Sequence, residues 1–370
     1  MSEFSPQDIV YMRQALCLAE RGLYTTAPNP RVGCLLVKDD EIVGEGWHEV
    51  AGGPHAEVVA IQQAADKSRG ATAYVTLEPC CHHGKTPPCS DALIEAGVAK
   101  VIVAMEDPNP RVAGMGLEQL RKAGIEVACG LLQEDAEALN PGFVQRMRHG
   151  RPFIRCKLAM SLDGRTAMAS GQSKWITGSA AREDVHRLRA RSCAIMSGIG
   201  TVLADDPSLT VRLEGEGDLR QPLRIILDPH LSTPETAKFL KQPGESLIVT
   251  ACTEEGVQQG LRDAGAEVVV LPNGGDAIDL VALMAYLAER EINEILMETG
   301  ATLSGALLRA GIIDELIVYM APKLMGDNAR GLFHTPGLED MDDAVELSIS
   351  DIRAVGSDWR ISATIKEVAG

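Results

Sequence analysis

Two short segments of the sequence together contain the residue types of a catalytic zinc site. The first holds His55 and Glu57, and the second holds Cys80 and Cys89. One histidine and two cysteines supply three protein ligands to zinc and leave the fourth tetrahedral position for water, as in catalytic sites. Glu57, two residues after the histidine, could exchange protons with that water without binding the metal. A His-x-Glu segment followed by Pro-Cys and a later Cys is typical of zinc-dependent base deaminases, although the Cys80–Cys89 spacing exceeds the usual Cys-x-x-Cys.

The local sequence also predicts how these ligands are presented. The apolar segment 73–77 favours a strand before Cys80, and Pro79 can begin a helix. The segment 54–61 predicts another helix start. Both ligand groups are therefore expected at helix N-termini, where the helix dipole favours a thiolate. Cys81 is next to a ligand but is expected to point away from the metal.

The composition limits the classes of protein and of partner. A length of 370 residues predicts two domains, and a net charge of -17 argues against a nucleic-acid partner, although a local pocket for one phosphate remains compatible. No apolar run approaches the ~20 residues that span a bilayer. Nine cysteines without a secretory signal pattern favour a soluble protein of the reducing cytoplasm rather than a disulfide framework.

The first part of the chain predicts a three-layer α/β/α domain. A helix over residues 7–22 precedes a hairpin of residues 32–38 and 41–46, which turns at Asp39-Asp40. Alternating helices and short apolar strands follow, and they predict a parallel sheet covered on both faces. The expected ranges are helices 54–66, 89–96 and 114–123 and strands 73–78, 100–105 and 125–129.

The basic, glycine-containing segment 146–151 is expected to be a solvated linker between the two domains. After it, a second sheet rich in βαβ units is predicted. Its expected strands are 153–159, 193–197, 223–227, 246–250, 267–271 and 294–298, with a helix over 277–290 and another that begins in 300–305. Gly198-x-Gly200 and the segment 300–305 are the candidates for a phosphate cradle. Neither is a full dinucleotide fingerprint, so the spacing alone favours glycines that pack in tight turns.

Further motifs extend along nearly the whole chain. They are residues 29–33, 55–57, 76–80 and 87–89 in the first half and residues 157–165, 175–177, 204–212 and 321–326 in the second. Together they resemble the bifunctional riboflavin-biosynthesis deaminase–reductases. The resemblance implies a cytidine-deaminase-like α/β/α domain over residues 1–147, followed by a dihydrofolate-reductase-like α/β domain over residues 151–370.

The resemblance also implies two reactions. One zinc ion per chain would serve deamination of 2,5-diamino-6-ribosylamino-4(3H)-pyrimidinone 5′-phosphate in the first domain. NADPH would then reduce 5-amino-6-(5-phosphoribosylamino)uracil to its ribityl product in the second. The expected partners are these small phosphorylated pyrimidines, with neither nucleic acid nor membrane, and a homodimer or higher homo-oligomer is expected through the reductase domain.

Site residues are carried over from the family at the matching positions. Deaminase substrate contacts are expected from Asn29, His48, His82 and Lys85. NADPH contacts are expected from Ala159, Trp175, Thr201, Asp205, Gly300, Ala301, Thr302, Leu303, Ser304, Gly305 and Ala306. Reductase substrate contacts are expected from Lys157, Ser173, Arg189, Leu209, Arg212 and Glu298.

The chemistry of these residue types is suitable, since arginine forks bind phosphate and a carboxylate binds sugar hydroxyls. Purely structural roles stay open for four of them. Asn29 could cap a turn, His48 could lie on a surface strand, Trp175 could pack in a core and Asp205 could cap a loop.

Two rival functions also stay open. The first is a deaminase of free nucleosides or guanine whose second domain is not catalytic. The second is a binding protein with a structural zinc knot, in which His82 or His83 completes the ligand set. The presence of Glu57 and of three spaced ligands argues against the knot, because a closed site needs a fourth ligand.

Overall fold

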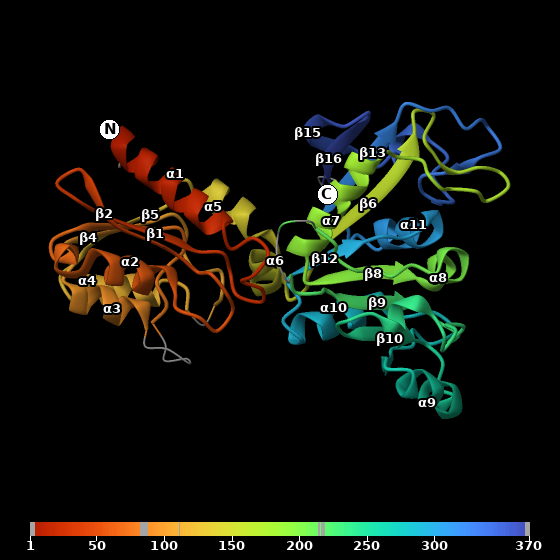
Figure 1. Cartoon of the computed structure of the whole chain (residues 1–370), viewed down its shortest axis with the longest axis horizontal. Coiled ribbons are helices and arrows are strands. Elements are labelled where there is room, and N and C mark those ends of the chain that lie inside the picture. The colour runs from red at the N-terminus through yellow and green to blue at the C-terminus, as the bar shows by residue number, and fades with distance from the viewer. Residues whose placement is uncertain (1–3, 82–87, 111, 214, 216–218, 367–370) are drawn as a thin grey trace. The chain divides into compact units, whose positions relative to one another are not determined.

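The computed structural model describes residues 4–81, 88–110, 112–213, 215 and 219–366 (Figure 1). The chain divides into two compact units, Met1–Arg151 and Pro152–Gly370. Within the described ranges, no helix is long and apolar enough to cross a membrane.

The expectation of a linker over 146–151 is partly wrong, because α6 (Pro141–His149) runs through most of it. Gly150, at φ 65°, ends that helix in the left-handed conformation that glycine tolerates best.

The first unit contains a five-stranded sheet with the order β2-β1-β3-β4-β5. Its strands are β1 (Gly33–Lys38), β2 (Glu41–Trp47), β3 (Thr72–Val75), β4 (Lys100–Val103) and β5 (Glu126–Cys129). β1 is antiparallel to β2 and β3, whereas β3, β4 and β5 run parallel. The predicted hairpin turn is confirmed: Asp39 and Asp40 both have positive φ, as a tight two-residue turn requires.

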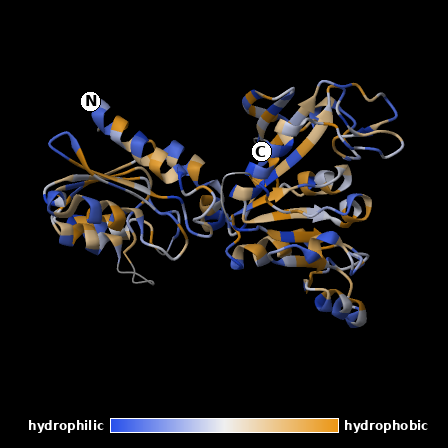
Figure 2. Cartoon of the chain, in the orientation of Figure 1, coloured by the Kyte–Doolittle hydropathy of each residue, from blue (hydrophilic) through white to orange (hydrophobic). Residues whose placement is uncertain are grey.

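Helices cover both faces of this sheet, which confirms the three-layer prediction. Alternate residues of β1 point to opposite faces: Leu35 packs with the helices of one layer and Leu36 with those of the other. The first layer comprises α1 (Pro6–Glu20), α5 (Gln133–Leu139) and α6, and the second comprises α2 (Ala56–Ala64), α3 (Cys89–Ala96) and α4 (Met115–Lys122). In Figure 2 the colour along α1 alternates between hydrophobic and hydrophilic, as expected of a helix with one buried face. The sequence interpretation did not include α5 and α6. A short 3₁₀ helix, η1 (Ala65–Ser68), follows α2.

The second unit contains a nine-stranded sheet with the order β11-β10-β9-β8-β12-β6-β13-β16-β15. Neighbouring strands are parallel from β11 to β13, and β16 and β15 are antiparallel at the edge. Its strands are β6 (Phe153–Ser161), β8 (Ala194–Gly198), β9 (Leu223–Leu227), β10 (Ser246–Thr250), β11 (Glu267–Val270), β12 (Glu294–Met297), β13 (Glu315–Ala321), β15 (Leu347–Val355) and β16 (Asp358–Ile365). A separate small ladder pairs β7 (Arg165–Ala167) with β14 (Arg330–Gly331).

Helices also cover both faces of the large sheet. α10 (Leu280–Glu289) and α11 (Ala301–Arg309) pack on one face, whereas α7 (Ser179–Arg191), α8 (Ile199–Asp205) and α9 (Glu255–Asp263) pack on the other. The 3₁₀ helices are η2 (Lys238–Lys241) and η3 (Met341–Asp343). The predicted ranges of β9 and β10 are confirmed residue for residue, but the edge hairpin of β15 and β16 was not predicted.

The carboxyl ends of β8 and β12 lie side by side, and each strand leads into a helix. The Glu298 backbone N–H donates to the Met196 carbonyl at 2.9 Å, and the Ser197 hydroxyl donates to the Glu298 carbonyl at 2.7 Å. In the sheet, β12 lies between β8 and β6. After β6 the chain adds β8, β9, β10 and β11 successively toward one edge, then returns through β12 and continues with β13 on the other side of β6. The direction in which strands are added therefore reverses near β8 and β12. Parallel sheets bind ligands at such places, beyond the carboxyl ends of the strands.

Candidate active sites

The three predicted zinc ligands come together in the first unit. His55 Nδ1 lies 3.1 Å from Cys89 Sγ and 3.6 Å from Cys80 Sγ. All three ligand atoms lie within 4.8 Å of one another. A tetrahedral zinc with bonds of about 2.0–2.3 Å places its ligands roughly 3.5 Å apart, so the set fits this metal.

Two of the three ligands lie at helix N-termini. His55 is the N-cap residue of α2, and Cys89 is the first residue of α3. The expectation that a helix begins at Pro79 is wrong, because Cys80 lies in the loop that follows β3. The carbonyl of Cys80 accepts from the Ser90 backbone N–H and hydroxyl, both at 3.1 Å, and these bonds hold the loop against the start of α3.

The Glu78 carboxylate, two residues before Cys80, explains why this segment stays non-helical. It accepts the backbone N–H groups of Asp107 and Gly114 with one oxygen and those of Gly116 and Leu117 with the other, at 2.8–3.3 Å. These bonds tie the end of β3 to the start of α4. Cys80 is thereby fixed by contacts that are distant in sequence.

The electrostatics of the ligand set favour a thiolate at Cys80. A hydrogen bond from the Cys89 thiol, and then one from His55, lower the pKa of Cys80 to about 4. The same contact raises the pKa of Cys89. A thiolate is the form of cysteine that binds metals.

Glu57 lies in the first turn of α2 and is only 3% exposed. Burial raises the pKa of its carboxyl to about 7. The helix start is pressed against β2, since a Cβ at Gly46 would lie 2.2 Å from the Ala56 carbonyl. A carboxyl group with a pKa near neutrality can both accept and deliver a proton, as a general acid–base group must.

Asn29 and His48 form a hydrogen-bonded pair beside the ligands. His48 Nδ1 lies 2.9 Å from the Pro54 carbonyl, which can only accept, so this nitrogen carries the proton. His48 Nε2 is then the acceptor for the Asn29 amide at 3.0 Å. The His48 and His55 rings meet edge to face at 5.4 Å, and burial lowers the pKa of His48. His48 is 3% exposed, so the interpretation as a surface residue is wrong. His82 and Lys85, the other two predicted substrate contacts, lie outside the described residues.

In the second unit, the structure brings together most of the predicted reductase substrate contacts. Arg189 on α7 donates from Nε and Nη2 to the two oxygens of Glu298, at 2.6 and 3.0 Å. Burial lowers the pKa of Lys157 on β6, and Glu298 opposes that effect. Burial alone would raise the pKa of Glu298, but Arg189 and Lys157 bring it to about 2. Glu298 is therefore a carboxylate at neutral pH, bound to the Arg189 guanidinium.

Leu209 and Arg212 belong to the segment after α8. The Leu209 side chain is 3% exposed and packs in the core, so a substrate contact at this position would come from its backbone. Arg212 is exposed, and its backbone N–H donates to His186 Nδ1 at 3.1 Å. His186 was missed in the sequence interpretation. Its spacing of three residues from Arg189, which places both on one helix face, was the available signal.

The predicted cofactor contacts lie mainly at the starts of α8 and α11. A Cβ at Gly200 or at Gly300 would meet nothing within 4 Å, so the backbone there is open to a ligand. This open backbone suits the phosphates of a dinucleotide. Ser304, by contrast, is buried and hydrogen-bonded to Thr299, and Gly305 packs against the backbone of His334.

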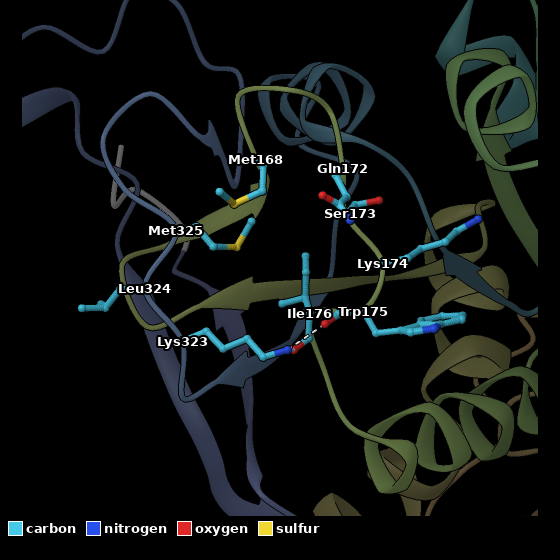
Figure 3. A pocket seen from close by; sticks show the side chains of 9 residues that line it. All are labelled: Met168, Gln172, Ser173, Lys174, Trp175, Ile176, Lys323, Leu324 and Met325. Atoms are coloured by element: carbon cyan, nitrogen blue, oxygen red, sulfur yellow. Dashed lines mark hydrogen bonds between the residues drawn. The ribbon is translucent and has the colours of Figure 1, made fainter.

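A cavity of about 250 Å³ in the second unit includes two predicted contacts, Ser173 and Trp175 (Figure 3). Its lining residues are Met168, Gln172, Ser173, Lys174, Trp175, Ile176, Lys323, Leu324 and Met325. Lys323 Nζ donates to the carbonyls of Trp175 and Ile176, both at 2.7 Å.

Trp175 is 65% exposed, so its interpretation as a packed core aromatic is wrong. The guanidinium of Arg182 lies 4.6 Å from the centre of its ring. Lys174 pairs with Asp205 at 2.8 Å, which connects the Trp175 loop to the end of α8. Of the remaining predictions, Ala159 lies in β6 and Thr201 in the first turn of α8.

Comparisons with known proteins find similar sequences along nearly the whole chain. Residues 5–105 match the cytidine and deoxycytidylate deaminase zinc-binding region, and residues 152–361 match the RibD C-terminal domain. The riboflavin biosynthesis protein RibD of Escherichia coli is 53% identical over 95% of this chain and 98% of its own length, and that of Haemophilus influenzae is 52% identical over the full length of both.

Solved structures are similar over the same extent. Acinetobacter baumannii RibD, form 1, has a TM-score of 0.91 and 47% identity, covering 98% of this chain and 99% of that one. A diaminohydroxyphosphoribosylaminopyrimidine deaminase/5-amino-6-(5-phosphoribosylamino)uracil reductase from Thermotoga maritima has a TM-score of 0.86 and 34% identity, covering 97% and 99%.

Proposed function

Because the chain belongs to the RibD family of bifunctional riboflavin-biosynthesis proteins, we propose that the first unit carries its deaminase activity and the second its reductase activity. The protein is an enzyme of riboflavin biosynthesis, both a hydrolase and an oxidoreductase. The observation that carries the assignment within the first unit is the set of His55, Cys80 and Cys89 with Glu57 buried two residues from a ligand.

In the deaminase unit, His55, Cys80 and Cys89 would hold zinc. When bound, the ion supplies the Lewis acidity that allows water to attack carbon near neutral pH. Glu57 accepts the proton of that water, then delivers protons to a ring nitrogen and to the departing ammonia. The pair of Asn29 and His48 orients the pyrimidine, since the Asn29 carbonyl oxygen can accept from a ring amide. The substrate proposed for this site is 2,5-diamino-6-ribosylamino-4(3H)-pyrimidinone 5′-phosphate.

In the reductase unit, the substrate is 5-amino-6-(5-phosphoribosylamino)uracil. NADPH would lie along the open backbone at Gly200 and Gly300, with Trp175 beside it, and it supplies the hydride. Glu298 accepts hydrogen bonds from the ribose hydroxyls, and Lys157 donates to an oxygen of the sugar. The exposed guanidinium of Arg212 binds the 5′-phosphate, for which an arginine fork is suited.

A coupled assay tests this assignment and its rivals. The diaminopyrimidine substrate is added to zinc-loaded enzyme with NADPH, and ammonia release and NADPH absorbance are followed separately. Both signals are expected, with NADPH oxidation dependent on prior deamination. Ammonia release without NADPH oxidation would favour a deaminase with a non-catalytic second unit. Zinc binding with neither activity would favour a structural zinc site.

We also propose that the second unit forms a homodimer through its edge hairpin. Leu347, Ile349 and Ile352 on the edge strand β15, and Trp359 on its neighbour β16, are exposed apolar residues. Exposed apolar edges of this kind favour pairing with another chain. An Ile352→Asp variant should shift the molar mass measured by light scattering from dimer to monomer, and an unchanged mass would refute this interface.

A cytoplasmic location is proposed as well, because a thiol-ligated zinc site needs reduced cysteines.

A further inference from the structure

The backbone of residues 210–212 is held by side chains rather than by a strand ladder. Arg189 Nη1 donates to the Thr210 carbonyl at 2.8 Å. The Gln221 amide bonds both backbone groups of Val211, accepting from its N–H at 2.9 Å and donating to its carbonyl at 3.3 Å. His186 Nδ1 accepts from the Arg212 N–H at 3.1 Å. Three side chains therefore satisfy four consecutive polar groups of one short segment.

This segment needs such support because of where it runs. Leu209, Thr210 and Val211 are each under 7% exposed, so their backbone groups have lost most of their water. Leu209 also has φ 49°, in the left-handed region that is unfavourable for a leucine. The next residue, Arg212, is exposed, and among the described residues no carboxylate is paired with its guanidinium. The segment thus joins a buried, fixed backbone to a cation available for a ligand.

We propose that His186 is a positioning residue of the reductase site, which fixes the Arg212 backbone and so directs the guanidinium toward the phosphate of the substrate. The inference rests on the proposed role of Arg212 as the phosphate contact. His186 and Arg189 lie three residues apart on the same face of α7, so one helix positions the Glu298 carboxylate and the Arg212 backbone together.

The role requires a neutral imidazole with its proton on Nε2, because only an unprotonated Nδ1 can accept from the Arg212 N–H. The surroundings maintain that form. Burial, and then the positive charges of Arg189 and Arg212, lower the pKa of His186 to about 4, against the opposing effects of Glu298 and the Thr210 carbonyl. The acceptor is therefore present throughout the neutral range.

Two polar substitutions separate the proposed contact from general packing. His186→Asn retains an acceptor oxygen close to the position of Nδ1, whereas His186→Gln places its amide near the position of Nε2 and loses that acceptor. Arg187→Ala is the matched control, since Arg187 lies on the same helix, is exposed and pairs with Glu183. Each variant is made in the full-length enzyme, and the reductase KM is measured for the phosphorylated substrate, for its dephosphorylated analogue and for NADPH.

His186→Gln is expected to raise the KM for the phosphorylated substrate about 3- to 10-fold, the effect of one misplaced hydrogen bond. The KM values for the dephosphorylated analogue and NADPH should stay near those of the unmodified enzyme, as should every value for His186→Asn and Arg187→Ala. In an Arg212→Ala background, His186→Gln should have no further effect on KM, because it acts through Arg212.

Three outcomes would overturn the inference. They are equal losses for both substrates, no difference between the Asn and Gln variants, or an undiminished effect of His186→Gln when Arg212 is already absent. Failure of the proposed function is distinguishable from these. If Arg212→Ala alone does not discriminate between the two substrates, Arg212 is not the phosphate contact, and the positioning role falls with it.

Discussion

Replacing Glu298 by glutamine should lower the free energy of unfolding of the second unit by about 3 kcal/mol at pH 7. Glutamine resembles the protonated carboxyl in size and polarity, but it lacks the charge that Arg189 and Lys157 stabilise. Arg189 would then remain buried without its counter-charge, because its side chain is only 12% exposed. Removing one partner of a buried ion pair is strongly destabilising for this reason.

The magnitude follows from the protonation equilibrium of Glu298. Arg189 and Lys157 outweigh the effect of burial and bring its pKa to about 2, from an ordinary value of 4.5. A tenfold change in that equilibrium corresponds to about 1.4 kcal/mol, so the charged form gains about 3 kcal/mol from the folded environment. Since the pKa is depressed, this stabilisation is fully present above pH ~5 and is lost as the pH falls toward 2.

Urea unfolding followed by tryptophan fluorescence measures the effect, because Trp175 and Trp359 report on the second unit and Trp47 on the first. The difference between the unmodified protein and Glu298→Gln should be largest at pH 7 and should shrink progressively between pH 4.5 and pH 2.5. Glu183→Gln is the matched control: it removes an exposed carboxylate that pairs with Arg187 on α7. Surface pairs of this kind contribute at most about 1 kcal/mol.

Two results would refute the reasoning. Equal unfolding free energies for Glu298→Gln and Glu183→Gln at pH 7 would show that the buried ion pair contributes no more than a surface pair. A large difference that does not decline in acid would assign the effect to packing rather than to charge.

Three further predictions concern the two activities. Glu57→Gln should retain zinc, measured by elemental analysis, but release ammonia at least ~10²-fold more slowly, because an amide cannot accept a proton from water; an active, zinc-loaded variant would contradict this. Cys89→Ala should lose zinc and deamination while reduction of the deaminated compound survives, with Cys81→Ala as the zinc-retaining control; loss of reduction in a folded Cys89→Ala variant would show that the two activities depend on each other. Arg212→Ala should raise the reductase KM for the phosphorylated substrate by roughly ten- to 150-fold, and for its dephosphorylated analogue much less, because a charge-assisted bond of ~1.5–3 kcal/mol is lost; equal losses on both would argue against phosphate binding.

Residue identity and short-range spacing were sufficient to predict the zinc ligands and the acid–base carboxyl group of the first unit. His55, Glu57, Cys80 and Cys89 are recognisable from the sequence because metal binding restricts the residue types and needs few of them. The two-residue hairpin turn and strands β9 and β10 were also predictable, since alternation, apolar character and turn preference are local properties.

Contacts between distant residues were not predictable in the same way. Pro79 permits a helix by local preference, yet Glu78 binds backbone groups up to 39 positions away and keeps that segment non-helical. The helices α5 and α6 and the edge hairpin of β15 and β16 also escaped prediction. Their short or mixed patterns become stable only when packed on a sheet that the rest of the chain builds.

What the sequence by itself determined is therefore the chemistry available to the protein: a zinc ligand set, a carboxyl group to move protons, and arginines suited to phosphate. Only the tertiary structure decided which groups act together. It places Arg189 against Glu298, 109 positions away, and it sets His186 and Gln221 around the backbone that leads to Arg212. The physical reason is that burial, which sets both the pKa values and the strength of these contacts, exists only after the chain has folded.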